Sequence, residues 1–346
     1  MSRTVEYKDL KGDYILVDVR TVGEYEEATI NGAINIPLFS DEERAIIGTI
    51  YTRKSTDEAK KIGVKVVAEK LPLIYDKVCD LEKLYGEVVF FCARGGMRSA
   101  SITELLAALG LKVRRIKGGY KGYRGFINEE LPKVNEDVTY VVLHGNTGVG
   151  KTEILKELRS EGCDVLDLEG CANHRGSILG AVGKGAYITQ KQFESNIYDE
   201  LKAAKGKYIF VEAESKRIGK VIIPDYIHSS MKAGIHIFVD ADLEFRSRVI
   251  IDEYTKGGEC NEEICQALIN LKKYIGDKNA DHYCELVRDN NYEEVVRELM
   301  VKYYDPLYNH TSKSYEYEKQ IMVTDVKEAA RELKCFYENL TEDNEE

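Results

Sequence analysis

The sequence has no tryptophan, only five prolines among 346 residues, and no apolar run long enough to cross a bilayer. Its first residues, MSRTVEYKDLKGDYILVD, include no apolar segment of the signal-peptide type. None of the eight cysteines forms a C-x-x-C pair, which argues against a zinc site and against a disulfide framework. We therefore expect a cytoplasmic protein that has no membrane partner and no structural metal.

Negative charge is abundant but unevenly distributed. The net charge is −11, and residues 251–346 alone hold 12 basic and 23 acidic side chains, so the preceding two thirds are close to neutral. An anionic partner is therefore not excluded for that part. Residues 112–124, KVRRIKGGYKGYR, contain six cations and no acid, and they form either a phosphate-contacting surface or a solvated loop. The six cations are Lys112, Arg114, Arg115, Lys117, Lys121 and Arg124.

Short apolar segments alternate with helical patterns along most of the chain, which is typical of parallel α/β sheets. The predicted strands lie at 14–20, 33–37, 87–91, 112–119, 139–144, 164–168, 208–214 and 235–242. We expect the strand at 112–119 to lie at the edge of its sheet. The polar segment 129–137 marks a domain boundary, so the prediction is an α/β domain at 1–132 and a second α/β core at 136–250. A helical extension with an acidic tail follows at 251–346.

One cysteine stands at the end of a predicted buried strand, in the stretch VVFFCARGGMRSAS. Two glycines allow a tight turn after it, and the helix that follows directs backbone N–H groups toward the loop. Together with two arginines, this setting favours a thiolate and makes the cysteine a candidate nucleophile. The candidate catalytic residues are Cys92, Arg94, Arg98 and Ser99.

A second loop, GNTGVGKT at 145–152, fits the phosphate-loop pattern G-x-x-x-x-G-K-[ST] between a strand and a helix. Its glycines let the backbone surround phosphate oxygens, Lys151 can reach a distal phosphate, and Thr152 can bind Mg²⁺ or a phosphate oxygen. Asp240 and Glu212 are both candidates for the acid that would hold the metal. The ligand is either a nucleotide or a diphosphate ester. The loop residues assigned to phosphate binding are Gly145, Asn146, Thr147, Gly148, Gly150, Lys151 and Thr152.

Two polar loops follow later strands, DLEGCANHRGSILG at 167–180 and EAESKRIG at 212–219. Ligands of α/β sheets bind at such positions, although solvated loops would have a similar composition. The candidate ligand residues in them are Asp167, Glu169, His174, Arg175, Ser177, Glu214, Lys216 and Arg217, of which His174, Arg175, Ser177 and Arg217 are assigned to phosphate binding.

Residues 5–128 resemble the rhodanese family. LVDVRTVGEYEEATINGAINIP is similar to the family pattern D-V-R…E-[YF]…I-x-G-A-x-x-[IL]-P, and GGYKGYR lies where rhodaneses have a late Gly-Gly. This resemblance implies that Cys92 carries a chalcogen atom as a persulfide or an analogous adduct. Typical sulfurtransferases of the family have a basic residue five positions after the cysteine. Here Arg98 stands six positions after Cys92, which is the spacing of cysteine phosphatases, and the longer loop makes room for a phosphate-sized anion.

Residues 5–310 as a whole resemble the tRNA 2-selenouridine synthase family. The motifs that carry this resemblance, in chain order, are CARGGMRS, GNTGVGKT, DLEGCANHRGS, EAESKRIG and YYDPLY, and ERAIIGTIYTRKS at 43–55 is also similar. The resemblance implies that the substrate is a tRNA with 2-thiouridine at the wobble position. It further implies that geranyl diphosphate alkylates the sulfur and that selenium from selenophosphate then replaces the S-geranyl group.

Under this reading Cys92 handles selenium, the P-loop domain holds geranyl diphosphate, and the cations of 112–124 contact the anticodon region of the tRNA. We expect no tightly bound cofactor, apart from Mg²⁺ at the P-loop, and the oligomeric state stays open, a monomer included. The alternative is a cysteine-dependent sulfurtransferase or phosphatase fused to an ATP-binding P-loop domain. Further alternatives are a nucleotide-regulated tRNA-binding protein and an enzyme that stops after geranylation.

Overall fold

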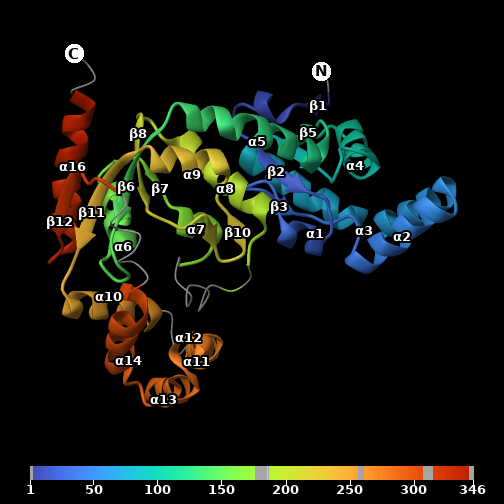
Figure 1. Ribbon diagram of the computed structural model, residues 1–346. Helices are drawn as coiled ribbons and strands as arrows, with labels where there is room; N and C mark the ends of the chain where they lie inside the picture. The colour runs from blue at the N-terminus through green and yellow to red at the C-terminus, as the bar shows by residue number, and fades with distance from the viewer. Residues whose placement is uncertain (1–2, 176–184, 186, 256–260, 307–314, 343–346) are drawn as a thin grey trace. The chain divides into compact units, whose positions relative to one another are not determined.

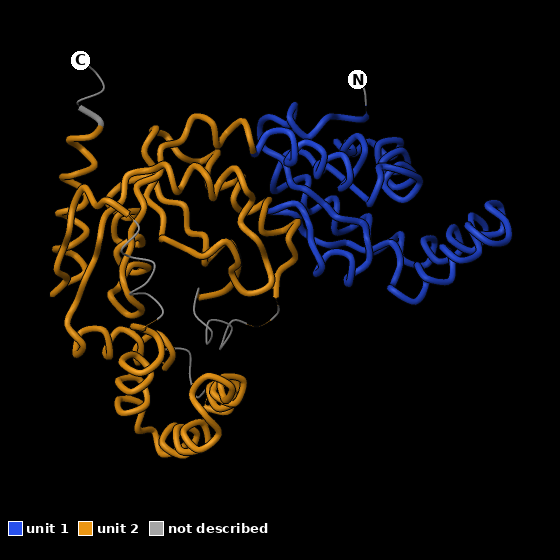
Figure 2. The backbone as a smooth tube through the Cα atoms, in the orientation of Figure 1, with its two compact units in different colours: residues 1–131 blue, residues 132–346 orange. Residues whose placement is uncertain are grey.

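The computed structural model describes residues 3–175, 185, 187–255, 261–306 and 315–342. The chain divides into two compact units, residues 1–131 and 132–346, which Figure 2 shows in blue and orange. The division falls within helix α5 (Gly119–Glu136), so the polar segment interpreted as a domain boundary is mostly helical rather than an extended linker. Each unit is an α/β structure with a five-stranded parallel sheet, which confirms the predicted fold class.

The sheet of the first unit has the strand order β1-β5-β4-β2-β3, and all of its pairings are parallel (Figure 1). Its strands are β1 (Thr4–Val5), β2 (Ile15–Asp18), β3 (Ile34–Asn35), β4 (Val88–Phe91) and β5 (Val113–Ile116). The prediction that the strand at 112–119 lies at the edge was wrong, because the two-residue strand β1 pairs with β5 on its outer side. The cysteine-bearing strand β4 is central and fully buried.

The helices of the first unit are η1 (Tyr7–Asp9), α1 (Val22–Glu27), α2 (Asp41–Arg53), α3 (Thr56–Tyr85), α4 (Met97–Ala108) and α5. The long helix α3 contains Pro72, yet it continues to Tyr85. Its C-terminal half packs on the sheet through Ile74 and Val78, which belong to the core with Val88 and Phe90. The N-terminal half packs against α2, and together they form a helical hairpin inserted between β3 and β4.

The sheet of the second unit has the order β12-β11-β6-β8-β7, again with parallel pairings. Its strands are β6 (Thr139–His144), β7 (Val165–Leu166), β8 (Tyr208–Glu212), β11 (Ile235–Asp240) and β12 (Lys319–Met322). The strand β12 was not predicted and comes from a region expected to be helical. Ile321 of this strand and Val323, which follows it, enter the core of this unit beside Ile237 and Val239.

Helices surround this second sheet and fill the C-terminal region. They are α6 (Lys151–Ser160), α7 (Leu168–Ala172), α8 (Gln190–Ala203), α9 (Asp225–Lys232), α10 (Leu243–Thr255), α11 (Asn261–Asn270), α12 (Lys272–Ile275), α13 (Asp277–Arg288), α14 (Tyr292–Leu299), the π-helix η2 (Met300–Tyr304) and α16 (Val326–Glu342). A small hairpin, β9 (Arg217–Ile218) with β10 (Val221–Ile222), completes the unit. Within the described residues, no helix is both long and apolar enough to pass through a membrane.

Candidate functional site

The thiol of Cys92 lies directly after β4, at the carboxyl end of the first sheet, and is only 3% exposed. Its Sγ atom is 3.1 Å from Oγ of Ser99, which lies on the first turn of α4 and is fully buried. Helix α4 begins after Gly96, which has no side chain to cap the first backbone N–H groups. An anion in this loop would therefore meet free N–H groups and the helix dipole.

The backbone of residues 118–121 holds the cysteine loop in place. The N–H of Tyr120 donates to the carbonyl of Cys92 over 2.8 Å, and the N–H of Lys121 donates to that of Ala93 over 2.9 Å. Gly119 has φ +58°, and a Cβ atom there would lie 2.1 Å from the Cys92 oxygen. Only glycine fits at this position without moving the cysteine loop.

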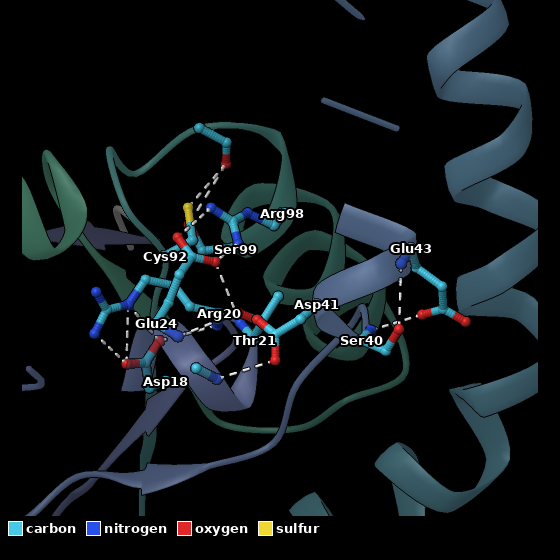
Figure 3. A network of polar contacts seen from close by, with 12 residues as sticks. Asp18, Arg20, Thr21, Glu24, Ser40, Asp41, Glu43, Cys92, Arg98 and Ser99 are labelled. Atoms are coloured by element: carbon cyan, nitrogen blue, oxygen red, sulfur yellow. Dashed lines mark hydrogen bonds and ion pairs between the residues drawn. The ribbon is translucent and has the colours of Figure 1, made fainter. Parts of the chain in front are cut away.

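The two arginines of the loop differ. Arg94 is exposed, whereas Arg98 is largely buried and makes a bidentate ion pair with Glu24, at 2.7 Å and 3.3 Å (Figure 3). Burial alone would raise the pKa of Glu24, but the hydrogen bond and the charge of Arg98 outweigh this effect and lower it. The positive charge of Arg98 is thus shared with a carboxylate, which the sequence analysis did not anticipate.

A buried ion pair between Arg20 and Asp18 lies next to this site. Arg20 Nη2 contacts Asp18 Oδ2 at 2.6 Å and also donates to the carbonyl of Ala28, and its guanidinium lies 4.3 Å from the ring centre of Tyr120. Both charged residues come from the D-V-R stretch. Their hydrogen bonds fix them in place, so we assign them a positioning role rather than contact with a substrate.

The phosphate-loop sequence forms a turn between β6 and α6, as its pattern predicts. Gly145 passes so close to β11 that a Cβ atom would lie 2.2 Å from the carbonyl oxygen of Val239. The Lys151 amine donates to the carbonyl of Gly145 over 3.0 Å, and Thr152 donates to Glu212 over 2.7 Å. The geometry is that of a glycine-rich turn that leads into a helix N-terminus, which suits phosphate.

Three glutamates face this loop. Glu169, Glu212 and Glu214 come from α7, from the end of β8 and from the segment after it, and their carboxylate oxygens lie within 4.8 Å of one another. Burial, followed by the charges of the neighbouring glutamates, raises the pKa of Glu169 to about 10 and that of Glu214 to about 7. Burial also raises the pKa of Glu212, against the opposing effect of Lys151. Protons or a cation must therefore compensate part of this negative charge at neutral pH.

Of the two candidate metal-holding acids, the structure brings Glu212 to the loop, whereas Asp240 accepts a hydrogen bond from the N–H of Ala241. The partner role of Asp305, in the YYDPLY motif, was not predicted. It pairs with Arg246 at 2.6 Å, and Arg246 Nε donates to the carbonyl of Thr147 in the loop. This chain of contacts explains how a motif 150 residues away supports the phosphate loop.

The remaining predicted ligand residues are less closely associated with the loop. His174 is buried, and its ring would lie 2.7 Å from a Cβ atom added to Gly219. Arg175 makes an ion pair with Glu253 at 2.9 Å, and Arg217 is exposed on β9. Ser177 lies outside the described residues.

Four of the six cations predicted to contact tRNA are engaged within the first unit. Arg114 pairs with Glu87, Lys117 pairs with Glu6 at 2.9 Å, and Arg115 donates to the carbonyl of Gly95. Lys112 and Lys121 are exposed, and Arg124 donates to the side-chain oxygen of Asn128.

Two family models together match most of the chain. Residues 4–126 match a rhodanese-like domain, and residues 138–338 match the tRNA 2-selenouridine synthase AAA domain. The chain is 31% identical to the tRNA 2-selenouridine synthase of Hydrogenovibrio crunogenus, over 85% of this chain and 88% of that protein. It is 30% identical to the protein of the same name from Sulfurovum sp., over the same shares of both chains.

A solved structure also matches part of the chain. It is the N-terminal domain of a putative ATP/GTP binding protein from Clostridium difficile 630, 48% identical, which covers 36% of this chain and 98% of that one with a TM-score of 0.35.

Proposed function

We propose a function from the premise that the chain belongs to the tRNA 2-selenouridine synthase family. The protein is a tRNA-modifying transferase that converts wobble 2-thiouridine into 2-selenouridine in two steps. The first step alkylates the sulfur with geranyl diphosphate, and the second replaces the alkylated sulfur with selenium from selenophosphate. The observation that carries this proposal is the presence, in one chain, of a thiol-bearing anion loop and a separate phosphate loop.

The alkylation step fits the loop at 145–152. The sulfur of 2-thiouridine forms a bond to the allylic carbon of geranyl diphosphate while the carbon–oxygen bond breaks, and the electron pair leaves with diphosphate. The alkylated base then loses its N3 proton to water and becomes neutral. The diphosphate leaving group needs positive charge and N–H donors, which Lys151 and the N-terminus of α6 supply. His174, Arg175 and Arg217 remain candidates for additional contacts with it.

Magnesium fits the same loop chemically. The hydroxyl of Thr152 and the carboxylates of Glu212, Glu169 and Glu214 are hard oxygen donors close to one another, the ligand type that Mg²⁺ prefers. When bound, Mg²⁺ would neutralise charge on diphosphate. The residues of the chain would orient the diphosphate and keep the carboxylates within reach.

The selenium step fits the Cys92 loop. In this step the selenium of selenophosphate forms a bond to C2 of the base, the C2–S bond breaks, and geranylthiolate leaves with a proton from water. Hydrolysis of the Se–P bond then gives 2-selenouridine and phosphate. The loop offers N–H donors at the start of α4 and the exposed cation Arg94 for the phosphate group, and Cys92 with Ser99 at the reacting end.

The first experiment supplies tRNA that carries wobble 2-thiouridine, together with geranyl diphosphate, with and without selenophosphate, and identifies the nucleosides by mass spectrometry. We expect S-geranyl-2-thiouridine without selenophosphate and 2-selenouridine with it. In Cys92→Ser we expect geranylation at the wild-type rate and no detectable selenation. Loss of both steps in a folded Cys92→Ser protein would contradict this division of labour. Unchanged 2-thiouridine with the wild-type protein would favour the sulfurtransferase or phosphatase alternative.

A further inference from the structure

The helical hairpin between β3 and β4 carries a local excess of positive charge. We call residues 41–70, which comprise α2 and the first half of α3, the arm. The whole arm has seven cations and six acids, but most of the acids lie at its base. Between residues 44 and 65 there are six cations and two acids, a local net charge of +4. All six cations are exposed, and they are Arg44, Arg53, Lys54, Lys60, Lys61 and Lys65.

Most of these charges have no acidic partner in the protein. Lys60 lies 3.4 Å from Asp57, whereas Arg53, Lys54, Lys61 and Lys65 make no ion pair within the described residues. Every residue from 51 to 58 is exposed. Desolvated or paired charges would be poor phosphate ligands, so these free, solvated cations are well suited to an external polyanion.

Large apolar side chains accompany the cations. Ile46 and Tyr51 on α2 and Val64 on α3 are 57%, 46% and 69% exposed. None of the three is buried between the two helices. An exposed tyrosine among lysines and arginines is a typical RNA-binding surface, because the ring can stack on a base while the cations contact phosphates. An anionic membrane would attract the same charges, but the arm has no continuous apolar face in addition.

The cations at 112–124 offer a weaker surface than the arm. Glu87 and Glu6 compensate Arg114 and Lys117, and Arg115 is used to hold Gly95. In this tract only Lys112 and Lys121 are exposed cations without an ion pair among the described residues, against Arg53, Lys54, Lys61 and Lys65 on the arm.

The base of the arm is fixed beside the Cys92 site. Ser40 and Glu43 form a capping box at the start of α2, and Lys70 of α3 contacts Glu43 at 2.5 Å. The N–H of Gly23 donates to Asp41 over 3.2 Å, and Gly23 adjoins Glu24, the partner of Arg98 (Figure 3). The two helices therefore extend from the polar network of Cys92, and α2 alone reaches roughly 20 Å at 1.5 Å per residue.

From these contacts we propose that the arm is an RNA-docking element that binds the sugar–phosphate backbone of the substrate and thereby holds the modified base near Cys92. This inference rests on the proposed function, since it takes tRNA as the RNA. The tip cations contact phosphates, Tyr51 stacks on an exposed base, and the rigid base of the arm sets the distance to the thiol.

The test compares two variants that remove the same charge. The arm variant carries Arg53→Gln, Lys54→Gln, Lys60→Gln and Lys61→Gln. The control variant carries Lys202→Gln, Lys205→Gln, Lys278→Gln and Lys327→Gln, which are exposed lysines of the second unit. Fluorescence anisotropy gives the Kd for labelled tRNA between 50 and 200 mM salt, and circular dichroism checks the helix content. We expect the arm variant to bind about 10- to 100-fold more weakly, with a salt slope lower by about 3, and the control to change less than about 3-fold.

The outcomes separate this inference from the proposed function. Wild-type binding with an unchanged arm variant would overturn the role of the arm and leave the function intact, as would equal weakening of both variants. A wild-type protein that neither binds nor modifies tRNA would overturn both. Weaker binding of the arm variant to anionic vesicles, without any change on tRNA, would replace RNA with a membrane surface and overturn the inference.

Discussion

The Cys92 loop and the loop at 145–152 share one design but differ in their electrostatics. Each follows the central strand of a five-stranded parallel sheet, β4 or β6, and leads into the N-terminus of a helix, α4 or α6. In each, one glycine passes a backbone carbonyl so closely that no Cβ atom fits, at Gly119 beside the Cys92 loop and at Gly145. In both units the backbone therefore presents the N–H groups of a helix N-terminus to an anion.

The side chains then distinguish the two loops. Around Cys92 the nearby charges are Arg98, shared with Glu24, and the exposed Arg94. Around Lys151 there are three glutamates, two of which have pKa values raised to about 10 and about 7. We expect the first loop to bind an anion without a metal ion, and the second to need protons or a divalent cation before a diphosphate binds. A backbone motif alone therefore does not determine which anion a loop takes.

The largest expected effect comes from removing Lys151, the cation of the loop at 145–152, because this tests whether the two loops act separately. In Lys151→Ala we expect the geranylation rate to fall about 100- to 1,000-fold, because the developing charge on diphosphate loses its nearest counter-charge. Selenation of tRNA that already carries the S-geranyl group should proceed normally. Lys156→Ala, an exposed lysine of the same helix paired with Glu153, is the matched control. An equal loss in both half-reactions would show that the two loops do not act separately.

The comparison can be sharpened by making the first loop more positive. Glu24→Gln removes the carboxylate that shares the charge of Arg98, so the positive potential at Cys92 should rise. We expect iodoacetamide to modify Cys92 about 3- to 10-fold faster at pH 7, as measured by mass spectrometry of the Cys92 peptide. Glu26→Gln on the same helix should leave the rate unchanged. A slower reaction in Glu24→Gln would mean that Glu24 activates the thiol rather than restraining it.

The smallest expected effect concerns stability and pH. The folded protein keeps a proton on Glu169, whose pKa is raised to about 10, whereas the unfolded chain releases it near 4.5. Because the folded state binds more protons between these values, the free energy of unfolding falls as pH rises. Glu169→Gln should remove this slope and stabilise the second unit by about 1 to 3 kcal/mol at pH 8. Calorimetry from pH 6 to 9 measures it, with the exposed Glu153→Gln as control, and an unchanged slope would contradict the assignment.

The parts of both sites that are local in sequence could be predicted. A strand, a glycine turn and a helix start follow one another in CARGGMRS and in GNTGVGKT, and the pattern indicates the structure because neighbouring residues make it. The same holds for the helix at 56–85, whose apolar spacing outweighs the presence of Pro72. The parallel α/β architecture followed from the alternation of strands and helices.

The features that were missed depend on distant segments meeting. Strand β1 has only two residues, and β12 lies among helical patterns with little apolar sequence of its own; each pairs with a strand distant in the sequence. In the sequence Glu24 was noted only as part of a family pattern. It lies 74 positions before Arg98, so its pairing with that residue depends on the tertiary fold. Glu212 and Glu214 stand two positions apart in one motif, but Glu169 comes from an earlier segment, so only the fold brings the three carboxylates together.

The position of β12 also has a consequence for the order of events during synthesis. All strands of the first sheet are formed by residues 4–116, so that sheet can be completed early, while later parts of the chain are still being made. The second sheet gains its outer strand only from residues 319–322, and α16, which packs against α6, follows still later. Until β12 has been synthesised, the outer edge of β11 has unpaired backbone N–H and C=O groups in the nascent chain, and chaperones shield such edges. The nascent protein would thus acquire its cysteine loop well before it has a finished phosphate loop.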